Sequence, residues 1–219
     1  NEMAVLNGMG GIETTEFLLS KIDDFGTPDA YNHYAVGWAH ALCTPYQWTK
    51  QVASHWGGTR NGTIVHWPAG LADKGSTRNQ FHHVIDVAPT ILDATGIPAP
   101  LYVNGIQQAP LEGVSMLPTL QDATTPESHV VQYFEMFGNR AIYHDGWIAS
   151  CFHGRLPWVR TESHSFGDTE RWELYRLDGD FSQGIDLAAE YPDKLAELKV
   201  VFDTEARKYN VYPLNDETT

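Results

Sequence analysis

The sequence predicts an α/β fold in two parts, and three patterns support that prediction. Residues 63–67 are a β-branched run that Pro68 closes, and residues 86–95 have a helical pattern, so a strand is followed by a helix as in an α/β layer. Residues 130–176 hold short aromatic and β-branched segments, which predict an antiparallel sheet. A helix that opens at Pro192 completes the chain.

The first predicted element is a helix between Gly10 and Gly26. Leu18, Ile22 and Phe25 recur at i, i+4 and i+7, and this spacing places them on one apolar stripe. Gly26 suits the left-handed residue that often ends a helix. The sequence therefore predicts a helix that stops at Gly26.

The sequence predicts a connection at residues 27–50 from weak signals and a helix at residues 86–95 from strong ones. Residues 27–50 are rich in aromatic side chains but show no clear period, so we expect a structured connection there. The helix at 86–95 is better marked. Asp86 is a good N-cap candidate, Pro89 lies in the first turn, and Gly96 ends the helix.

The second part of the chain has the pattern of an antiparallel meander. Its predicted strands are residues 130–137, 140–144, 147–152 and 172–176. Gly138-Asn139 and Asp145-Gly146 are tight links of the kind that join neighbouring antiparallel strands. The final helix carries an apolar stripe, which consists of Leu195, Leu198, Phe202 and Tyr209. Residues 211–219 have the composition of a frayed tail.

A polar, turn-rich stretch at residues 122–128 predicts a boundary between the two parts. We expect residues 1–127 to belong to an α/β domain whose sheet is flanked by helices. Residues 128–219 are then a C-terminal subdomain with the antiparallel sheet and the final helix.

The composition is that of a globular protein with an acidic surface. The 219 residues are 42% hydrophobic, and the formal net charge is −14. Because such a surface repels nucleic-acid backbones and anionic membranes, neither is expected as a partner. No apolar run reaches the roughly 18–20 residues of a membrane helix, and the chain does not open on the basic-then-apolar pattern of a signal peptide. We therefore expect a soluble protein, cytoplasmic or periplasmic, that is either processed or a piece of something longer.

The cysteines and histidines predict no disulfide framework and no metal site. Cys43 and Cys151 are two cysteines far apart in the sequence, and free thiols are favoured over a bridge. His82 and His83 are adjacent, so their side chains point in different directions, and one of them is expected to be structural.

Lys50 is the cation with the most informative surroundings. It stands shortly before His55 and the pair Gly57-Gly58, and paired glycines allow a close approach of backbone to backbone or to a ligand. A lysine held beside such a turn is a compact cation that can bind an oxyanion. The alternative, that Lys50 is an ordinary solvated charge on the surface, stays open at this point.

Four segments of the chain together resemble the C-terminal half of a type I sulfatase, an arylsulfatase-like enzyme of the alkaline phosphatase superfamily. Residues 44–68 are similar to the family's lysine, glycine-glycine-x-arginine and strand before proline. Residues 83–98 are similar to its D-x-x-P-T-x-L helix, and residues 105–115 to its D/E-G-x-S segment. Residues 172–188 are similar to the closing E-L-Y-D-L…N-L-A element. The segments occur in the family's order along nearly the whole chain.

The resemblance implies a sulfuric ester hydrolase in which Lys50 contacts the sulfate near the leaving oxygen. It also implies a weaker substrate-binding candidate, His55, on the active-site side of the same loop. The family uses a formylglycine nucleophile made in a C/S-x-P-x-R motif. The stretch from Cys43 to Gln47 has glutamine where that motif has arginine, so Cys43 is expected to be a small buried side chain instead.

The resemblance further implies calcium in the complete enzyme, bound by carboxylate and amide oxygens. The family's aspartate-asparagine-glycine ligands are missing here, because Leu6, Arg60 and Val103 precede the three Asn-Gly pairs. We therefore expect no metal bound by this chain alone, with the metal ligands and the nucleophile upstream of it.

Three functions remain open from the sequence. The first is a sulfatase of which this is the C-terminal portion, acting on a small sulfate ester or a sulfated glycan. The second is a phosphonate or phosphate monoester hydrolase of the same superfamily. The third is a non-catalytic remnant that binds a partner, or self-associates, through an exposed sheet.

Overall fold

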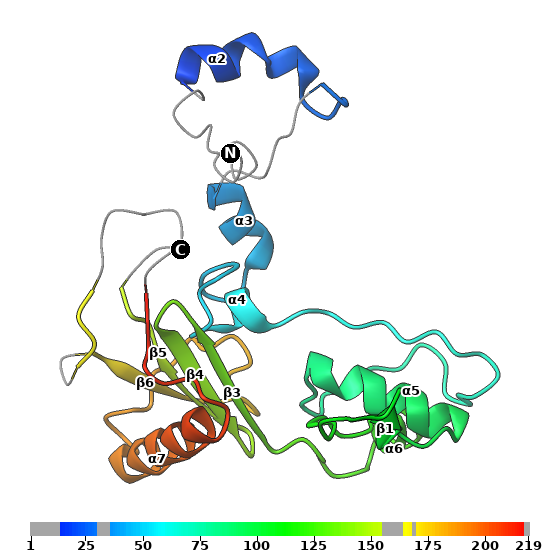
Figure 1. The fold of residues 1–219 in the computed structure, drawn as a ribbon. Helices are drawn as coiled ribbons and strands as arrows, with labels where there is room; N and C mark the ends of the chain where they lie inside the picture. The colour runs from blue at the N-terminus through cyan, green and yellow to red at the C-terminus, as the bar shows by residue number, and fades with distance from the viewer. Residues whose placement is uncertain (1–13, 30–35, 155–163, 168–169, 217–219) are drawn as a thin grey trace. The chain divides into compact units, whose positions relative to one another are not determined.

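The computed structural model describes residues 14–29, 36–154, 164–167 and 170–216. The chain separates into two compact units, Asn1–Thr44 and Pro45–Thr219 (Figure 1). The boundary predicted at 127/128 lies inside the second unit and stays a prediction about the domains of the complete enzyme.

The N-terminal unit confirms the predicted helix in part. Helix α2 (Thr15–Ser20) begins after Thr14, whose hydroxyl accepts a hydrogen bond from Phe17 N at 3.2 Å. The helix stops at Lys21, where ψ is 9°, and a 3-10 turn (η1, Ile22–Asp24) follows, so the predicted single helix is broken. Its predicted start at Gly10 lies outside the described residues. Gly26 has φ 85°, the left-handed conformation that was predicted.

A second helix, α3 (Val36–Cys43), corrects the prediction of a structured connection at 27–50. The sequence of α3 is apolar on several sides and has no single stripe, so hydrophobic periodicity misses it. No residue of α2 or α3 is buried. The apolar stripe predicted for α2 is therefore exposed, with Leu18 at 40% and Ile22 at 58%.

The antiparallel sheet is confirmed. Its strands are β3 (Val131–Met136), β4 (Asn139–His144), β5 (Trp147–Cys151) and β6 (Trp172–Arg176), in the order β3-β4-β5-β6. Asp145 and Gly146 have φ 48° and 76°, as expected for a two-residue hairpin turn. The first turn is Phe137-Gly138 instead of Gly138-Asn139, because Met136 pairs with Asn139.

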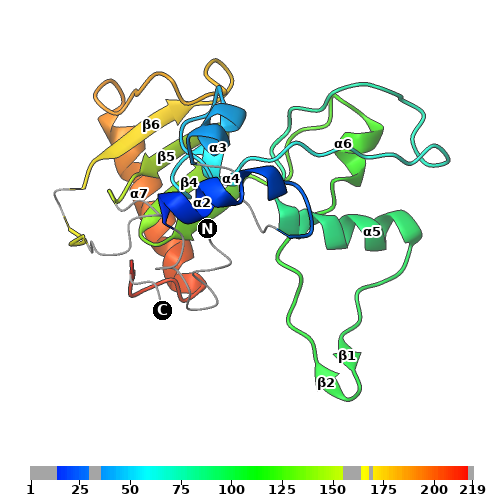
Figure 2. The ribbon, with the colours of Figure 1, turned by 90° about the horizontal axis from the view of Figure 1, so that it is seen from above.

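Helix α7 (Pro192–Lys208) packs on one face of this sheet, as Figures 1 and 2 show. Its residues Leu198, Phe202 and Ala206 form a buried cluster with Ile142, Ala149 and Leu174. The predicted stripe is thus the core-facing side of the helix. Tyr209 follows the helix and stacks on Tyr133 with ring centroids 5.5 Å apart.

The prediction of a frayed tail is wrong for residues 211–216. Val211 N donates to Ala206 O at 2.8 Å, and the Val211 side chain packs against the core of the sheet. Asp216 is 3% exposed and accepts a hydrogen bond from His164 N at 2.8 Å. These contacts tie the chain end to the fold; residues 217–219 lie outside the part that the structure describes.

The strand predicted at residues 63–67 is also wrong. Neither sheet contains this segment, and its apolar side chains face outward, with Ile64 at 96% exposure. β-Branched residues favour a strand only where a neighbouring strand pairs with their backbone and covers their side chains. In the described part of the chain that neighbour is missing, so the segment runs as extended coil.

The helix predicted at 86–95 is confirmed as a 3-10 turn (η2, Val84–Asp86) that continues into α5 (Val87–Thr95) and ends at Gly96 with φ 68°. Asp86 occupies the N-cap position of α5, as predicted, but its side chain makes no capping hydrogen bond to that helix. Its buried carboxylate accepts hydrogen bonds from His83 N at 2.8 Å, Val114 N at 2.9 Å and His129 Nδ1 at 2.8 Å. It therefore joins three segments of the chain.

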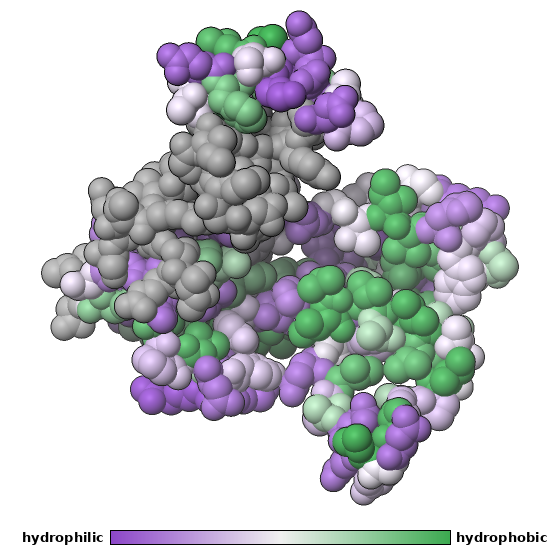
Figure 3. Space-filling model, turned by 45° about the horizontal axis from the view of Figure 1, so that its top comes forward, coloured by the Kyte–Doolittle hydropathy of each residue, from purple (hydrophilic) through white to green (hydrophobic). Residues whose placement is uncertain are grey.

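Three further elements escaped prediction. They are α4 (Trp56–Thr59), the small hairpin β1 (Tyr102–Val103) and β2 (Ile106–Gln107), and α6 (Leu117–Gln121). Figure 3 shows hydrophobic side chains gathered on the face of the part that contains α5 and the hairpin. Ile91 of α5 is 57% exposed and Ile106 of β2 is 68% exposed.

The fold class is a mixture of helices and antiparallel sheets, in agreement with the predicted α/β class. Cys43 and Cys151 form no disulfide, as predicted, and burial raises the pKa of the Cys151 thiol to about 11. Of the helices in the described ranges, none has the length and apolar character needed to cross a membrane.

Candidate functional site at the Lys50 turn

Lys50 lies exposed at the tip of a turn that Val52 N closes by donating to Thr49 O at 3.1 Å. Trp48 and Gln51, on either side of it, have φ 66° and 75°. Residues with side chains rarely adopt positive φ, and such conformations persist only where the surroundings hold them. The backbone around Lys50 is therefore held in an unusual shape by its contacts.

The paired glycines provide part of that support, as the sequence predicted. A Cβ on Gly57 would lie 2.2 Å from Trp48 O, and one on Gly58 would lie 2.1 Å from Val52 O. Gly57 N donates to Gln47 O at 3.0 Å across this contact. Only glycine lets helix α4 approach the backbone of the Lys50 turn so closely.

Aromatic packing fixes the same segment on the sheet. Trp48 stacks on Phe152 with ring centroids 4.3 Å apart. Trp56 is 3% exposed and belongs to a buried cluster with Ala141, Ile148 and Tyr175. Successive residues of a strand point to opposite faces of the sheet. The Trp56 cluster therefore covers the face opposite to the one that packs against α7.

His55, the second predicted substrate-binding residue, lies inside the protein. It is 1% exposed, with Nδ1 2.9 Å from Ser54 Oγ and Nε2 3.1 Å from Glu173 Oε2. The hydrogen bond from His55 lowers the pKa of Glu173. The structure therefore brings His55 to Glu173 of β6, and its substrate contact stays a prediction.

Gln183 holds the base of the turn, and sequence reasoning missed it. Its backbone carbonyl accepts from Gln47 Nε2 at 2.5 Å, and its side-chain Oε1 accepts from Trp56 N at 2.7 Å. No motif links Gln47 with a residue 136 positions away. Gln47, which replaces the arginine of the C-x-P-x-R pattern, is thus an anchor of the Lys50 turn.

A shallow cavity of about 300 Å³ lies next to this segment. Its lining residues are Gln51, Ala53, Gly58, Thr59, His83 and residues 132–136 of β3. Burial lowers the pKa of His83, so its imidazole is neutral at pH 7. The cavity combines one carboxylate, that of Glu135, with neutral and apolar groups.

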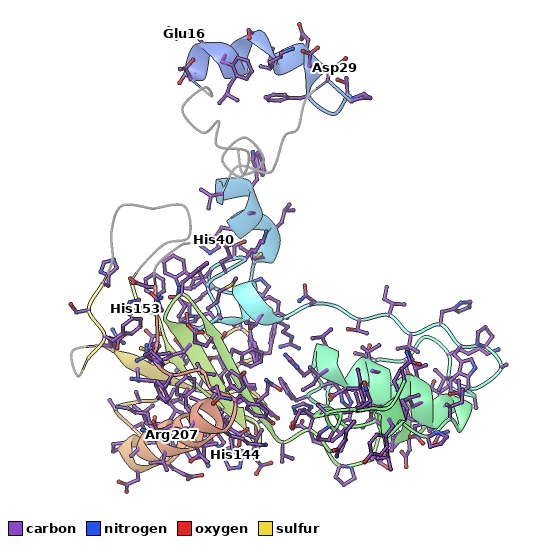
Figure 4. The ribbon with its side chains drawn as sticks, viewed as in Figure 1. Glu16, Asp29, His40, His144, His153 and Arg207 are labelled. Atoms are coloured by element: carbon purple, nitrogen blue, oxygen red, sulfur yellow. The ribbon has the colours of Figure 1, made fainter. Side chains whose placement is uncertain are left out.

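The residues that the structure describes do not fit a metal site. In the described part of the chain, no group of three or more histidine, cysteine, aspartate or glutamate side chains could hold an ion. His82 Nε2 lies 2.8 Å from Thr119 Oγ1, which is a structural contact of the kind predicted for one histidine of the pair. Figure 4 places His153 after β5, where it contacts Glu170 and Asp216.

Comparisons with known proteins find that this segment is similar to one family. The family model described as Sulfatase matches residues 39–97, which include the Lys50 turn, α4 and α5. An uncharacterized sulfatase of Schizosaccharomyces pombe is 25% identical over 181 residues, which cover 82% of this chain and 30% of the relative.

Solved structures resemble the fold. One was reported with the metabolism of multiple glycosaminoglycans by Bacteroides thetaiotaomicron, and it has a TM-score of 0.50 at 21% identity. The matched region is 70% of this chain and 30% of the chain in that structure. Another, Ps i-CgsB in complex with k-i-k-neocarrahexaose, has a TM-score of 0.52 at 17% identity. The matched region is 80% of this chain and 34% of the Ps i-CgsB chain. The chain spans about a third of the length of the relatives that it matches.

Proposed function

The resemblance of this chain to the sulfatases is established, and from that premise we propose that it forms the C-terminal portion of a sulfuric ester hydrolase and supplies Lys50 to the sulfate. The family-model match over residues 39–97, with the Lys50 turn inside it, carries this proposal. The rigid base and the exposed tip of the turn agree with a cation that is held out toward a ligand.

The chemistry of Lys50 follows from its side chain. The ammonium is a compact positive charge with three N–H donors, so it can donate to an oxygen of the sulfuryl group. In the transition state, negative charge grows on those oxygens and on the leaving oxygen, and a nearby cation stabilises it. We propose that Lys50 has this role and that His55 supports the loop behind it.

The rest of the catalytic apparatus is proposed to lie outside this sequence. Calcium would supply a hard cation for oxygen ligands, and a formylglycine would supply the nucleophile. The described residues offer no cluster for the ion. This chain therefore contributes positioning and one positive charge to the reaction.

For the substrate we propose a sulfate ester, with a sulfated glycan ahead of a small aryl sulfate. The solved relatives named above were studied with glycosaminoglycan metabolism and with k-i-k-neocarrahexaose, which favours the glycan. A phosphonate or phosphate monoester remains the alternative within the superfamily. The nucleophile distinguishes the two, because a cysteine in C-x-P-x-R indicates sulfate, and a plain serine or threonine indicates phosphate.

The first test is the intact mass of the protein in its source, detected with an antibody against this chain. The proposal expects a mass far above 24.5 kDa. A mass near 24.5 kDa would support the hypothesis that the chain is a short, non-catalytic binding protein. Light scattering would then show whether it associates with itself or with a partner.

A second test uses the purified 219-residue chain, which we expect not to hydrolyse an aryl sulfate with calcium at a useful rate. The reason is that the sequence lacks the C/S-x-P-x-R motif and that its described residues offer no metal cluster, so a product assay should stay at the level of the blank. If the chain hydrolyses the aryl sulfate and Lys50→Ala abolishes that hydrolysis, the proposal that the chain supplies only part of the active site is contradicted.

A further inference from the structure

We propose that Gln183 is the positioning residue of the Lys50 turn. It follows β6 in the sequence, and both its backbone and its side chain contact the segment that carries Lys50. The inference rests on the proposed function for the role of Lys50, and on the contacts of Gln183 alone for the positioning.

Every polar group of Gln183 has a partner. Besides the contacts to Gln47 and Trp56, its N donates to Asp180 O at 3.3 Å and its Nε2 donates to Ser150 Oγ at 3.1 Å. The residue is 0% exposed and has φ 60°. A non-glycine residue in this conformation costs about 1 kcal/mol or more, so the surrounding contacts must hold it there.

The partners of Gln183 lie on both sides of Lys50. Gln47 comes before the turn and Trp56 comes after it, and Gly57 N also donates to Gln47 O at 3.0 Å. One buried residue therefore fixes both ends of the turn. Ser150, the partner of its amide nitrogen, is 0% exposed and lies in β5, an interior strand of the sheet. The position of the turn is thus set relative to an interior strand of the sheet.

A second connection, between His55 and Glu173, keeps the segment near β6 without Gln183. It reaches the turn from one side only. Loss of the Gln183 side chain should therefore leave the sheet folded and loosen the turn itself. This difference separates a positioning residue from one that merely stabilises the core.

The experiment compares Gln183→Met, which keeps the length of the side chain without its polar ends, with Gln183→Glu, which keeps an acceptor for Trp56 N. Gln107→Met, on the exposed strand β2, is the matched control. Hydrogen exchange of the Trp56 amide reports the turn, and exchange of the Ala149 and Leu174 amides reports the sheet. The NMR signal of the Lys50 side chain is followed in sodium sulfate and in sodium chloride of equal ionic strength.

We expect Gln183→Met to speed Trp56 exchange by about tenfold and to weaken the sulfate response of Lys50 several-fold, with sheet exchange unchanged, because the hydrogen bond from Trp56 N is lost together with the one to Ser150 Oγ. Gln183→Glu should restore much of the Trp56 protection, and Gln107→Met should match the wild type. If Gln183→Met equals the wild type in both Trp56 exchange and Lys50 response, the proposal is overturned.

Two further results are decisive. Should Gln183→Met fail to fold, Ser150→Ala removes the far partner instead, and an unchanged Lys50 response in that variant overturns the proposal. If wild-type Lys50 shows no saturable shift with sulfate, the sulfate contact of the proposed function fails. Trp56 exchange then still decides whether Gln183 positions the turn.

Discussion

At the scale of single residues, close backbone contacts set the shape of the candidate site. Gly57 and Gly58 lie against carbonyl oxygens of the Lys50 turn, where no side chain has room. Glu170 is held in a different way, as a carboxylate buried between the side chains of Arg140 and His153. Each makes a prediction that a single substitution tests.

Gly58→Ala should destabilise the protein by about 1–3 kcal/mol, because the added Cβ would lie 2.1 Å from Val52 O, a backbone atom that cannot turn away. Gly62→Ala is the control, since nothing lies within 4 Å of its Cβ. It should be neutral or stabilising by up to about 1 kcal/mol. Urea unfolding measures both, and equal midpoints for the two variants would refute the close contact.

Acid should destabilise the protein through Glu170. Burial alone would raise its pKa, but hydrogen bonds from Arg140, His153 and Gly167 N outweigh burial and lower the pKa from 4.5 to about 2. Because the folded pKa is the lower one, Glu170 contributes stability above pH 4.5 that is lost as the pH falls toward 2.

The test is the free energy of unfolding between pH 5 and pH 2.5 in wild type and Glu170→Gln. Proton uptake by Glu170 adds up to about 1.4 kcal/mol per pH unit to the wild-type slope, and the variant should lack this part. Glu190→Gln, at an exposed position, should keep the wild-type slope. Parallel curves for wild type and Glu170→Gln would contradict the assignment.

At the scale of elements, packing decides which sequence patterns become structure. The stripe of α7 is buried against the sheet, whereas the stripe of α2 is exposed and its helix is short. His144, which ends β4 and is labelled in Figure 4, has its Nδ1 3.7 Å from Glu197 of α7. That contact is at the surface and adds little to the apolar packing below it.

Phe202→Ala should therefore cost about 3–5 kcal/mol, since Phe202 is 2% exposed and part of the core. Val200→Ala in the same helix, at 66% exposure, should change stability by no more than about 0.5 kcal/mol. Thermal unfolding followed by circular dichroism compares the two. A small effect of Phe202→Ala would mean that α7 is not held by the sheet.

At the scale of the whole molecule, the buried clusters of the described residues lie in residues 45–219. Both buried clusters lie in that unit, and neither α2 nor α3 contributes a buried residue. Removal of residues 1–44 should thus change the unfolding free energy by less than about 1 kcal/mol and Tm by less than about 4 °C. Calorimetry of the full chain and of the 45–219 piece makes the comparison, and a drop of 10 °C or more would contradict it.

The sequence by itself determined the elements whose signals are local. The meander follows from alternating strands and turn residues such as Asp145-Gly146, and α7 follows from Pro192 and its stripe. The resemblance to the sulfatases, confirmed by the comparisons, likewise rests on short segments read in order. In these cases neighbours in the sequence carry the information, so no tertiary contact is needed to see it.

Only the tertiary structure decided the rest, because the deciding partners are distant in the sequence. Residues 63–67 have strand composition but no paired neighbour in the described part of the chain, and so stay extended and exposed. Asp86 stands at the N-cap position of α5, but its carboxylate accepts from His129, 43 positions away, and makes no hydrogen bond that caps the helix. Gln183 reaches back 136 positions to Gln47 and thereby shapes the turn around Lys50. A hydrogen bond of this span leaves no periodic trace in the sequence, since it depends on how the sheet brings the two segments together.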